Sequence, residues 1–182
     1  MPCTGATGHL LKPAMKTPIF LLLLPLALFS CGKDEAPRRQ PDCPTGYTGS
    51  ECHQQLTPTG IWLAKIDVLE FPAVMPSGAP WDGGNGPDLY LRISRENSHV
   101  ATTPVYSDAV PGSMPTILLD QPFKLDAERT YQFALYDLDP IGENPLMGTI
   151  SGPVYSPIAG FPAVLQKQEN GVKLKLHVTY TW

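Results

Sequence analysis

The feature that most constrains this chain is an alternation of apolar and polar residues with a period of two. It is clearest in Val172–Tyr180, VKLKLHVTY, where every second residue is apolar. Because successive side chains of a β-strand point to opposite faces, this alternation predicts a strand with one buried face. Shorter or looser versions of the pattern occur in three other segments, namely 61–69, 89–93 and 131–136. No stretch has a convincing helical period, since the best candidate, 157–168, is interrupted by two prolines and a glycine.

Turn-forming residues separate the alternating segments. The chain contains 21 Pro and 16 Gly, spread along its length rather than gathered into one tract. This distribution favours short strands joined by turns over long helices. Seven or eight such strands over about 120 residues are typical of a two-sheet sandwich. We therefore predict an all-β fold, an eight-stranded antiparallel β-sandwich, for residues 60–182.

Charge is distributed unevenly between the start of the chain and the rest. Two of the 13 basic residues precede Cys31, whereas all 17 acidic residues follow it, so the part after Cys31 carries a net charge of −6. Phosphate backbones are bound by clustered positive charge, which this composition lacks. Nucleic acid is therefore excluded as an expected partner, and a cation is compatible with the charge.

An apolar run near the N-terminus predicts export. Residues 19–29, IFLLLLPLALF, follow Lys12 and Lys16 and precede Ser30. A basic start, an apolar stretch of this length and a small residue at its end describe a signal peptide, here residues 1–30. The run is too short to span a bilayer of about 30 Å, and a buried core helix is the alternative. We interpret residues 1–14 as a mis-assigned start or an extended basic region.

The end of this run, Leu28-Phe29-Ser30-Cys31, resembles the lipobox of bacterial lipoproteins. The resemblance implies that Cys31 is acylated and becomes the new N-terminus, so that the chain is attached to a membrane. Residues 33–35, Lys-Asp-Glu, resemble a signal that sends lipoproteins to the cell surface, and a solvated linker is the alternative. We expect a lipid-anchored protein of the outer membrane, facing either the periplasm or the cell surface.

The remaining cysteines predict a disulfide. Cys3 leaves with the signal peptide and Cys31 takes lipid, so Cys43 and Cys52 remain as an even pair in an oxidising compartment. Their segment, CPTGYTGSEC, resembles the last loop of an EGF-like module, although the other cysteines of such a module are absent. Residues 31–59 are otherwise polar and without apolar periodicity. We interpret them as a lipidated, disordered tether that carries one disulfide loop over 43–52.

Four segments of residues 60–182 together resemble a C2 domain, the calcium-dependent membrane-docking β-sandwich. They are GIWLAKIDVLEFP (60–72), WDGGNGPDLYLRI (81–93), LYDLDPIGENPLMG (135–148) and GVKLKLHVTYTW (171–182). In order, these are similar to the first strand, the first calcium loop with the next strand, the strand that leads into the third calcium loop, and the last strand. The resemblance covers nearly the whole domain and implies a calcium-binding loop end.

The residues that this resemblance assigns to calcium are Asp82, Asp88, Asp137 and Asp139. Calcium takes six to eight oxygen ligands, so carboxylates must converge from loops at one end of the scaffold. Without a cation, four close carboxylates would repel one another strongly. The alternative is that both segments are ordinary surface turns, since Asp, Asn and Gly are the residues that turns prefer.

The sequence departs from the family pattern at Pro145. In the family a carboxylate occupies this position, and proline offers no side-chain ligand. Glu143 and Asn144 are neighbours that carry side-chain oxygens. With four carboxylates we expect one calcium ion, bound weakly, with a dissociation constant on the order of 10⁻⁴ to 10⁻³ M as in extracellular modules.

Two apolar residues lie close to these loops, Trp81 and Ile141. In membrane-docking members of the family, apolar loop tips insert into lipid once calcium screens the carboxylates. On this reading both residues contact a membrane or ligand, and the alternative is that Trp81 packs as a lid over the end of the sandwich.

No enzyme signature is present in the sequence. A Gly-x-Ser-x-Gly elbow, a phosphate-binding glycine loop and zinc-type His/Cys spacing are all absent. The leading hypothesis is a non-enzymatic, membrane-anchored C2-like module that binds calcium at its loop end and contacts a lipid head group, a glycan or a partner protein. The alternative is a metal-free sandwich that serves as an interaction or spacer module on the cell surface.

Overall fold

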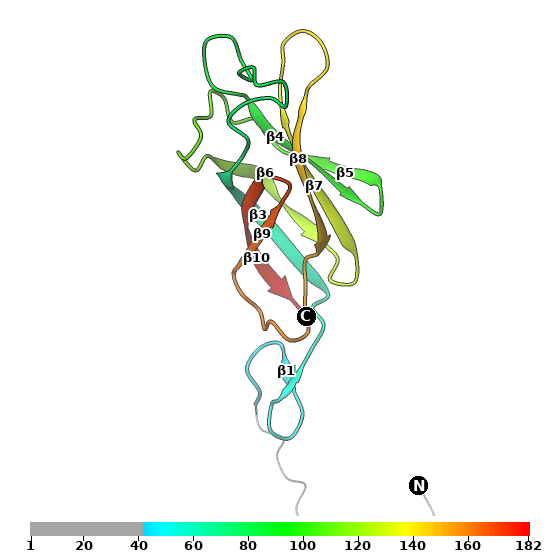
Figure 1. Cartoon of the computed structure of the whole chain (residues 1–182). Coiled ribbons are helices and arrows are strands. Elements are labelled where there is room, and N and C mark those ends of the chain that lie inside the picture. The colour runs from blue at the N-terminus through cyan, green and yellow to red at the C-terminus, as the bar shows by residue number, and fades with distance from the viewer. Residues whose placement is uncertain (1–41) are drawn as a thin grey trace, which may run out of the picture. The chain divides into compact units, whose positions relative to one another are not determined.

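The computed structural model describes residues 42–182 (Figure 1). The predicted signal peptide over 1–30, the predicted acylation site at Cys31 and the surface signal expected at 33–35 lie outside the described residues. Within 42–182 all regular structure is β-strand. Residues 42–182 contain no helix that is long and apolar enough to cross a bilayer.

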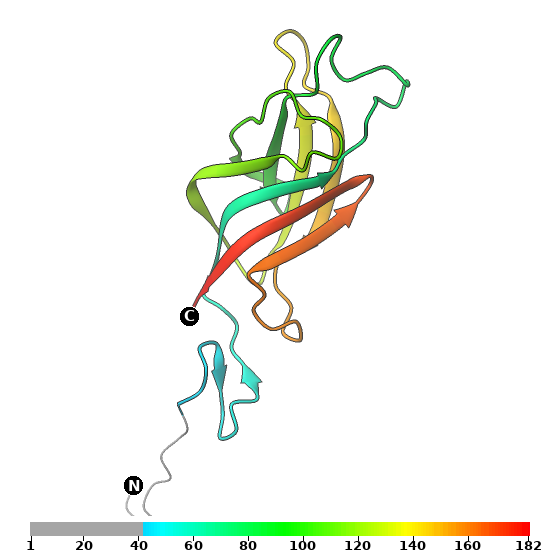
Figure 2. The same cartoon turned by 90° about the vertical axis from the view of Figure 1, so that its left-hand side faces the viewer.

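Two four-stranded antiparallel sheets form the sandwich. The first has the order β6 (Thr116–Leu125), β3 (Gly60–Glu70), β10 (Val172–Thr181), β9 (Val164–Glu169). The second has the order β5 (Ser98–Thr102), β4 (Leu89–Arg95), β7 (Thr130–Asp137), β8 (Leu146–Pro153). Figure 2 shows the two sheets from the side, with loops gathered at both ends. The predicted eight-stranded antiparallel sandwich is confirmed.

The core is built from the apolar half of each alternating strand. Val172, Leu174 and Leu176 of β10 are buried, whereas the lysines between them are only half-buried. Burying an apolar side chain of this size contributes roughly 1.5–3 kcal/mol, so the alternating pattern fixes which face of each strand is inside. The other fully buried side chains come mainly from β3, β4 and β7: Ile61, Leu63, Ile66, Leu89, Leu91, Ile93, Tyr131, Phe133 and Leu135.

A bulge explains why the alternation in β3 is loose. Leu63 and Ile66 both point into the core although three positions separate them. The pairing of β3 with β6 shifts in register between Leu63 and Lys65, and the pairing with β10 shifts opposite, between His177 and Val178. One extra residue at a bulge reverses the phase of the strand that follows it.

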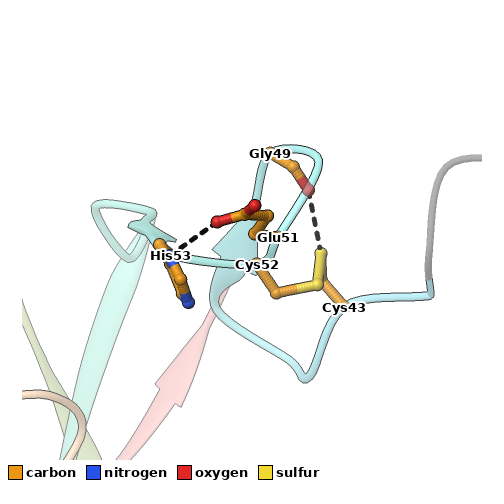
Figure 3. The surroundings of a disulfide bond; sticks show 5 residues. All are labelled: Cys43, Gly49, Glu51, Cys52 and His53. Atoms are coloured by element: carbon orange, nitrogen blue, oxygen red, sulfur yellow. Dashed lines mark hydrogen bonds and ion pairs between the residues drawn. A yellow bond between two sulfur atoms is a disulfide. The ribbon is translucent and has the colours of Figure 1, made fainter.

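A small hairpin precedes the sandwich. Its two strands, β1 (Tyr47–Thr48) and β2 (Gln54–Gln55), pair antiparallel. A disulfide joins Cys43 and Cys52, as predicted, with Cα atoms 5.2 Å apart (Figure 3). The Sγ atom of Cys43 also lies 3.5 Å from the carbonyl oxygen of Gly49, a packing contact because a disulfide sulfur carries no hydrogen. These residues belong to the segment that the sequence assigned to the tether.

Candidate metal centre

Strand pairing brings the two acidic segments together. Leu89, the first residue of β4, pairs with Asp137, the last residue of β7. The loop that enters β4 and the loop that leaves β7 therefore start side by side. Carboxylate oxygens of Asp82, Asp137 and Asp139 all lie within 4.8 Å of one another. Three of the four aspartates singled out in the sequence thus form one group.

Asp88, the fourth, borders the group and takes a structural part. Its backbone N–H donates to Oδ1 of Asp137 at 2.7 Å, and its own Oδ1 accepts from the backbone N–H of Asp108 at 2.9 Å. One of its carboxylate oxygens is therefore engaged in tying two loops together.

Asp137 is the most constrained side chain of the group. It is 0% exposed, and its Oδ2 atom is buried without a hydrogen-bond partner. Burial, reinforced by the charges of Asp82, Asp139 and Asp88, raises the pKa of Asp137 to about 6, against the opposing hydrogen bond from the backbone of Asp88. A buried carboxylate oxygen with no donor is costly in its ionised form, and residues 42–182 supply no hydrogen-bond partner for this atom.

The pKa of Asp82 is also raised, as that of Asp137 is. Partial burial raises its pKa, and the neighbouring carboxylates of Asp139, Asp88 and Asp108 raise it further. Each of these groups therefore disfavours the ionised form of Asp82. A cation among them reverses this repulsion.

Asp108 is a residue that the sequence analysis missed. It adopts a positive φ of 55° in the loop between β5 and β6, and its carboxylate accepts a hydrogen bond from the Asn85 side chain. Its backbone N–H bonds to Asp88, twenty residues earlier. No spacing in the sequence connects these positions, and only the packing of the loops brings them together.

Pro145, where the sequence departs from the family pattern, and its neighbour Asn144 both make hydrogen bonds at the acidic group. The carbonyl oxygen of Pro145 accepts from the backbone N–H of Asp137 at 3.1 Å. Oδ1 of Asn144 accepts from the backbone N–H of Asp139 at 3.1 Å, and its Nδ2 donates to the Tyr90 hydroxyl at 2.9 Å. Asn144 therefore holds Asp139 in place, while Glu143 is exposed.

Trp81 and Ile141 differ in exposure, since Trp81 is buried and Ile141 is exposed. Trp81 is 6% exposed and donates its indole N–H to the Pro72 carbonyl at 2.6 Å. It packs as a lid over the core, so the reading that it contacts a membrane or ligand is not supported. Ile141 is 91% exposed and stands in the loop that follows Asp139.

Among known proteins, only solved structures are similar to this chain. No family model and no curated protein matches the chain. Similar solved structures include one titled "Structure of a C2 domain", 13% identical over 68% of this chain and 98% of that chain, with a TM-score of 0.46. A C2 domain of a plant extended synaptotagmin 1 is 16% identical over 68% of this chain and 95% of that one, with a TM-score of 0.41. Human GIVD cytosolic phospholipase A2 is 14% identical over 69% of this chain and 17% of that chain, with a TM-score of 0.43.

Proposed function

We propose that this chain is a membrane-anchored lipoprotein whose C2-like domain binds one calcium ion through Asp82, Asp137 and Asp139. At this loop end the domain contacts a lipid head group, a glycan or a partner protein. The observation that carries the metal site is the buried Oδ2 atom of Asp137, which has no hydrogen-bond partner and lies among carboxylates. Membrane attachment through acylated Cys31 is supported by the sequence pattern at residues 28–31.

The donor set fits calcium. Calcium is a hard cation that binds carboxylate and carbonyl oxygens, and the three aspartates supply oxygens only. When bound, the ion neutralises the carboxylates and offers open coordination positions to oxygen atoms of a ligand. Three protein carboxylates satisfy part of a six- to eight-oxygen shell, which leaves such positions available.

The surrounding residues hold this group in position. Asp88 orients Asp137 through its backbone N–H, and Asn144 orients Asp139 through its side-chain oxygen. Ile141 stands exposed beside them and provides an apolar contact next to the charged site. The loop end thus combines a charged centre with an apolar tip.

Calcium is expected to stabilise residues 42–182 against heat. With a dissociation constant on the order of 10⁻⁴ to 10⁻³ M, about 5 mM calcium stabilises the native state by roughly 1 to 2 kcal/mol, because the ion binds the folded chain only. Differential scanning calorimetry would show this as a rise in melting temperature of a few degrees. Magnesium, which keeps its own water shell more tightly, is expected to have a much smaller effect.

Asp120→Asn is the matched control, because it removes one carboxylate from an exposed position in β6, outside the acidic group. It should keep the calcium response of the wild type. A melting temperature that does not change with calcium would contradict the metal site and favour the metal-free interaction or spacer module.

A further inference from the structure

The disulfide hairpin is packed tightly against the sandwich. Gly46 lies so close to Phe161 and Trp182 that a Cβ at this position would overlap the Phe161 ring and come within 2.7 Å of Trp182 Cζ2. Tyr47 meets Phe161 edge-on, with ring centroids 5.5 Å apart. Phe161 is in turn 5.0 Å from the ring of Trp182 and 5.4 Å from that of Tyr180. Tyr155 stacks on Phe161 with ring centroids 6.3 Å apart, and we call Tyr47, Tyr155, Phe161, Tyr180 and Trp182 the aromatic clasp.

Hydrogen bonds fix the connection between hairpin and sandwich. The Gln55 side chain donates to the Tyr155 hydroxyl at 2.9 Å, and that hydroxyl donates to the Leu56 carbonyl at 3.2 Å. A few residues on, the backbone N–H of Thr59 donates to the Thr181 carbonyl at 2.8 Å. The segment from 56 to 59, where a hinge would be expected between two units, is therefore bonded at both of its ends.

The clasp and the acidic group lie at opposite ends of the sandwich. Along the β3–β10 pair, Gly60 pairs with Thr181 beside the clasp, whereas Glu70 pairs with Lys173 at the far end. The eleven residues of β3 span roughly 35 Å at about 3.3 Å per residue. The loop that carries Asp82 follows directly after this far end. Figure 2 shows the C-terminus and the long loops at opposite ends of the sheets.

We propose that the hairpin and its aromatic clasp form a stalk that directs the acidic loops away from the membrane to which the chain is attached. The ligand that the loop end contacts then lies on a facing surface and not on that membrane. This inference rests on the proposed function, since it takes Cys31 as the anchor. From Cys31 to Asp42 the chain reaches at most about 40 Å, so turning the domain end over end on its own membrane would use nearly all of that length.

The orientation can be measured on vesicles. Residues 31–182 contain one cysteine outside the Cys43–Cys52 disulfide, so Cys31 can be coupled to a maleimide lipid. A fluorophore attached through a non-natural residue at position 45 or 141 then reports its height by energy transfer to acceptor lipids. In vesicles of phosphatidylcholine and phosphatidylserine, the position-45 label is expected to transfer more strongly than the position-141 label, with and without calcium. Equal transfer, or a rise at position 141 to the same level on adding calcium, would overturn the proposal.

Gly46→Ala tests the clasp, and Gly49→Ala is its matched control. Both glycines have positive φ, 87° and 93°, so both substitutions strain the backbone alike. Only a Cβ at Gly46 meets the clasp, while at Gly49 the nearest atom is 3.4 Å away in Gln54. Gly46→Ala is expected to raise transfer at position 141, and Gly49→Ala to leave it unchanged. Tyr155→Phe, which removes both hydroxyl bonds and keeps the ring, should act in the same direction as Gly46→Ala.

The failure of this inference can be told apart from failure of the proposed function. Transfer that is the same in Gly46→Ala, Tyr155→Phe and the wild type would show that the clasp does not set the orientation. If calcium raises the melting temperature but the label at position 141 transfers as strongly as the label at position 45, the stalk is contradicted and the calcium site is supported. If the position-45 label transfers more strongly than the position-141 label but calcium does not change the melting temperature, the stalk is supported and the calcium site is contradicted. Acylation of Cys31 is read separately, by metabolic labelling with an alkyne fatty acid.

Discussion

Asp137→Asn is expected to stabilise the calcium-free domain at pH 7 and to abolish its response to calcium. The raised pKa of Asp137, about 6 in the folded chain, means that its ionised form opposes folding. After allowance for solvent near the loop end, removing this charge should raise the free energy of unfolding by about 1–2 kcal/mol. Asparagine keeps the Oδ1 acceptor for Asp88, and its Nδ2 supplies a donor to the neighbouring carboxylates. Chemical denaturation at several calcium concentrations measures both effects.

The pH dependence of the wild type provides the second part of this test. Because the folded pKa of Asp137 is raised from 3.8 to about 6, its contribution to stability is complete below pH 3.8. That contribution is lost as the pH rises through about 6. The wild type should therefore lose stability relative to Asp137→Asn between about pH 4 and pH 7 in the absence of calcium. Taking the difference between the two proteins cancels carboxylates that titrate equally in both.

The variant Asp120→Asn serves as the control here as well, and its stability should follow that of the wild type at each pH. If Asp137→Asn lowered the stability of the calcium-free domain, the ionised Asp137 side chain would not oppose folding as its raised pKa implies. If it kept the calcium response, the ion would not depend on Asp137.

Gly86→Ala is expected to disrupt the acidic end of the sandwich. A Cβ at position 86 would overlap the carbonyl oxygen of Ala109 and lie 2.8 Å from its carbonyl carbon. Because both are backbone atoms, the two loops must move apart. The bonds at risk run from Ala109 N–H to Pro87 at 2.9 Å and from Asp108 N–H to Asp88 at 2.9 Å. We expect a loss of about 2–4 kcal/mol in unfolding free energy and a much weaker calcium response.

Gly84→Ala is the matched control for this change. It adds the same methyl group to the same loop, at a position where a Cβ would meet no atom within 4 Å. Its effect should stay within about 0.5 kcal/mol, as for other unconstrained surface positions. Equal melting temperatures for the two variants would show that the loops 82–88 and 105–110 are not held together in solution.

Strands β3, β4, β7 and β10 were predictable because the signal of each is local. In β10 the alternation runs over nine residues and states directly which face is buried. The interruption of 157–168 by proline and glycine likewise excluded a helix, and the segment forms a loop followed by β9. The bulge in β3 was not predictable, because an inserted residue changes the phase of the pattern and is defined only by the pairing with β6 and β10.

The acidic group was predicted in part. Asp137 and Asp139 lie two positions apart at a strand end, and Asp82 shares a segment of family spacing, so the sequence analysis found all three. Asp108 and Asn144 were not assigned a part, because each acts through a hydrogen bond to a residue placed by another stretch of chain or by a turn. The burial of Trp81, which the sequence offered only as an alternative, is set by its packing in the core, where its indole N–H also bonds to Pro72.

By itself, the sequence determined the all-β class, the buried face of the regularly alternating strand β10, the Cys43–Cys52 pair and, through the family resemblance, the identity of three clustered carboxylates. These properties depend on residue type and short spacing, which the chain carries before it folds. Only the tertiary structure decided that Asp137 is buried with one oxygen unpaired, that Asp88 ties loops together, and that the hairpin is clasped to the end opposite the acidic group. Each of these depends on contacts between segments far apart in the sequence, and such contacts exist only once both sheets have formed.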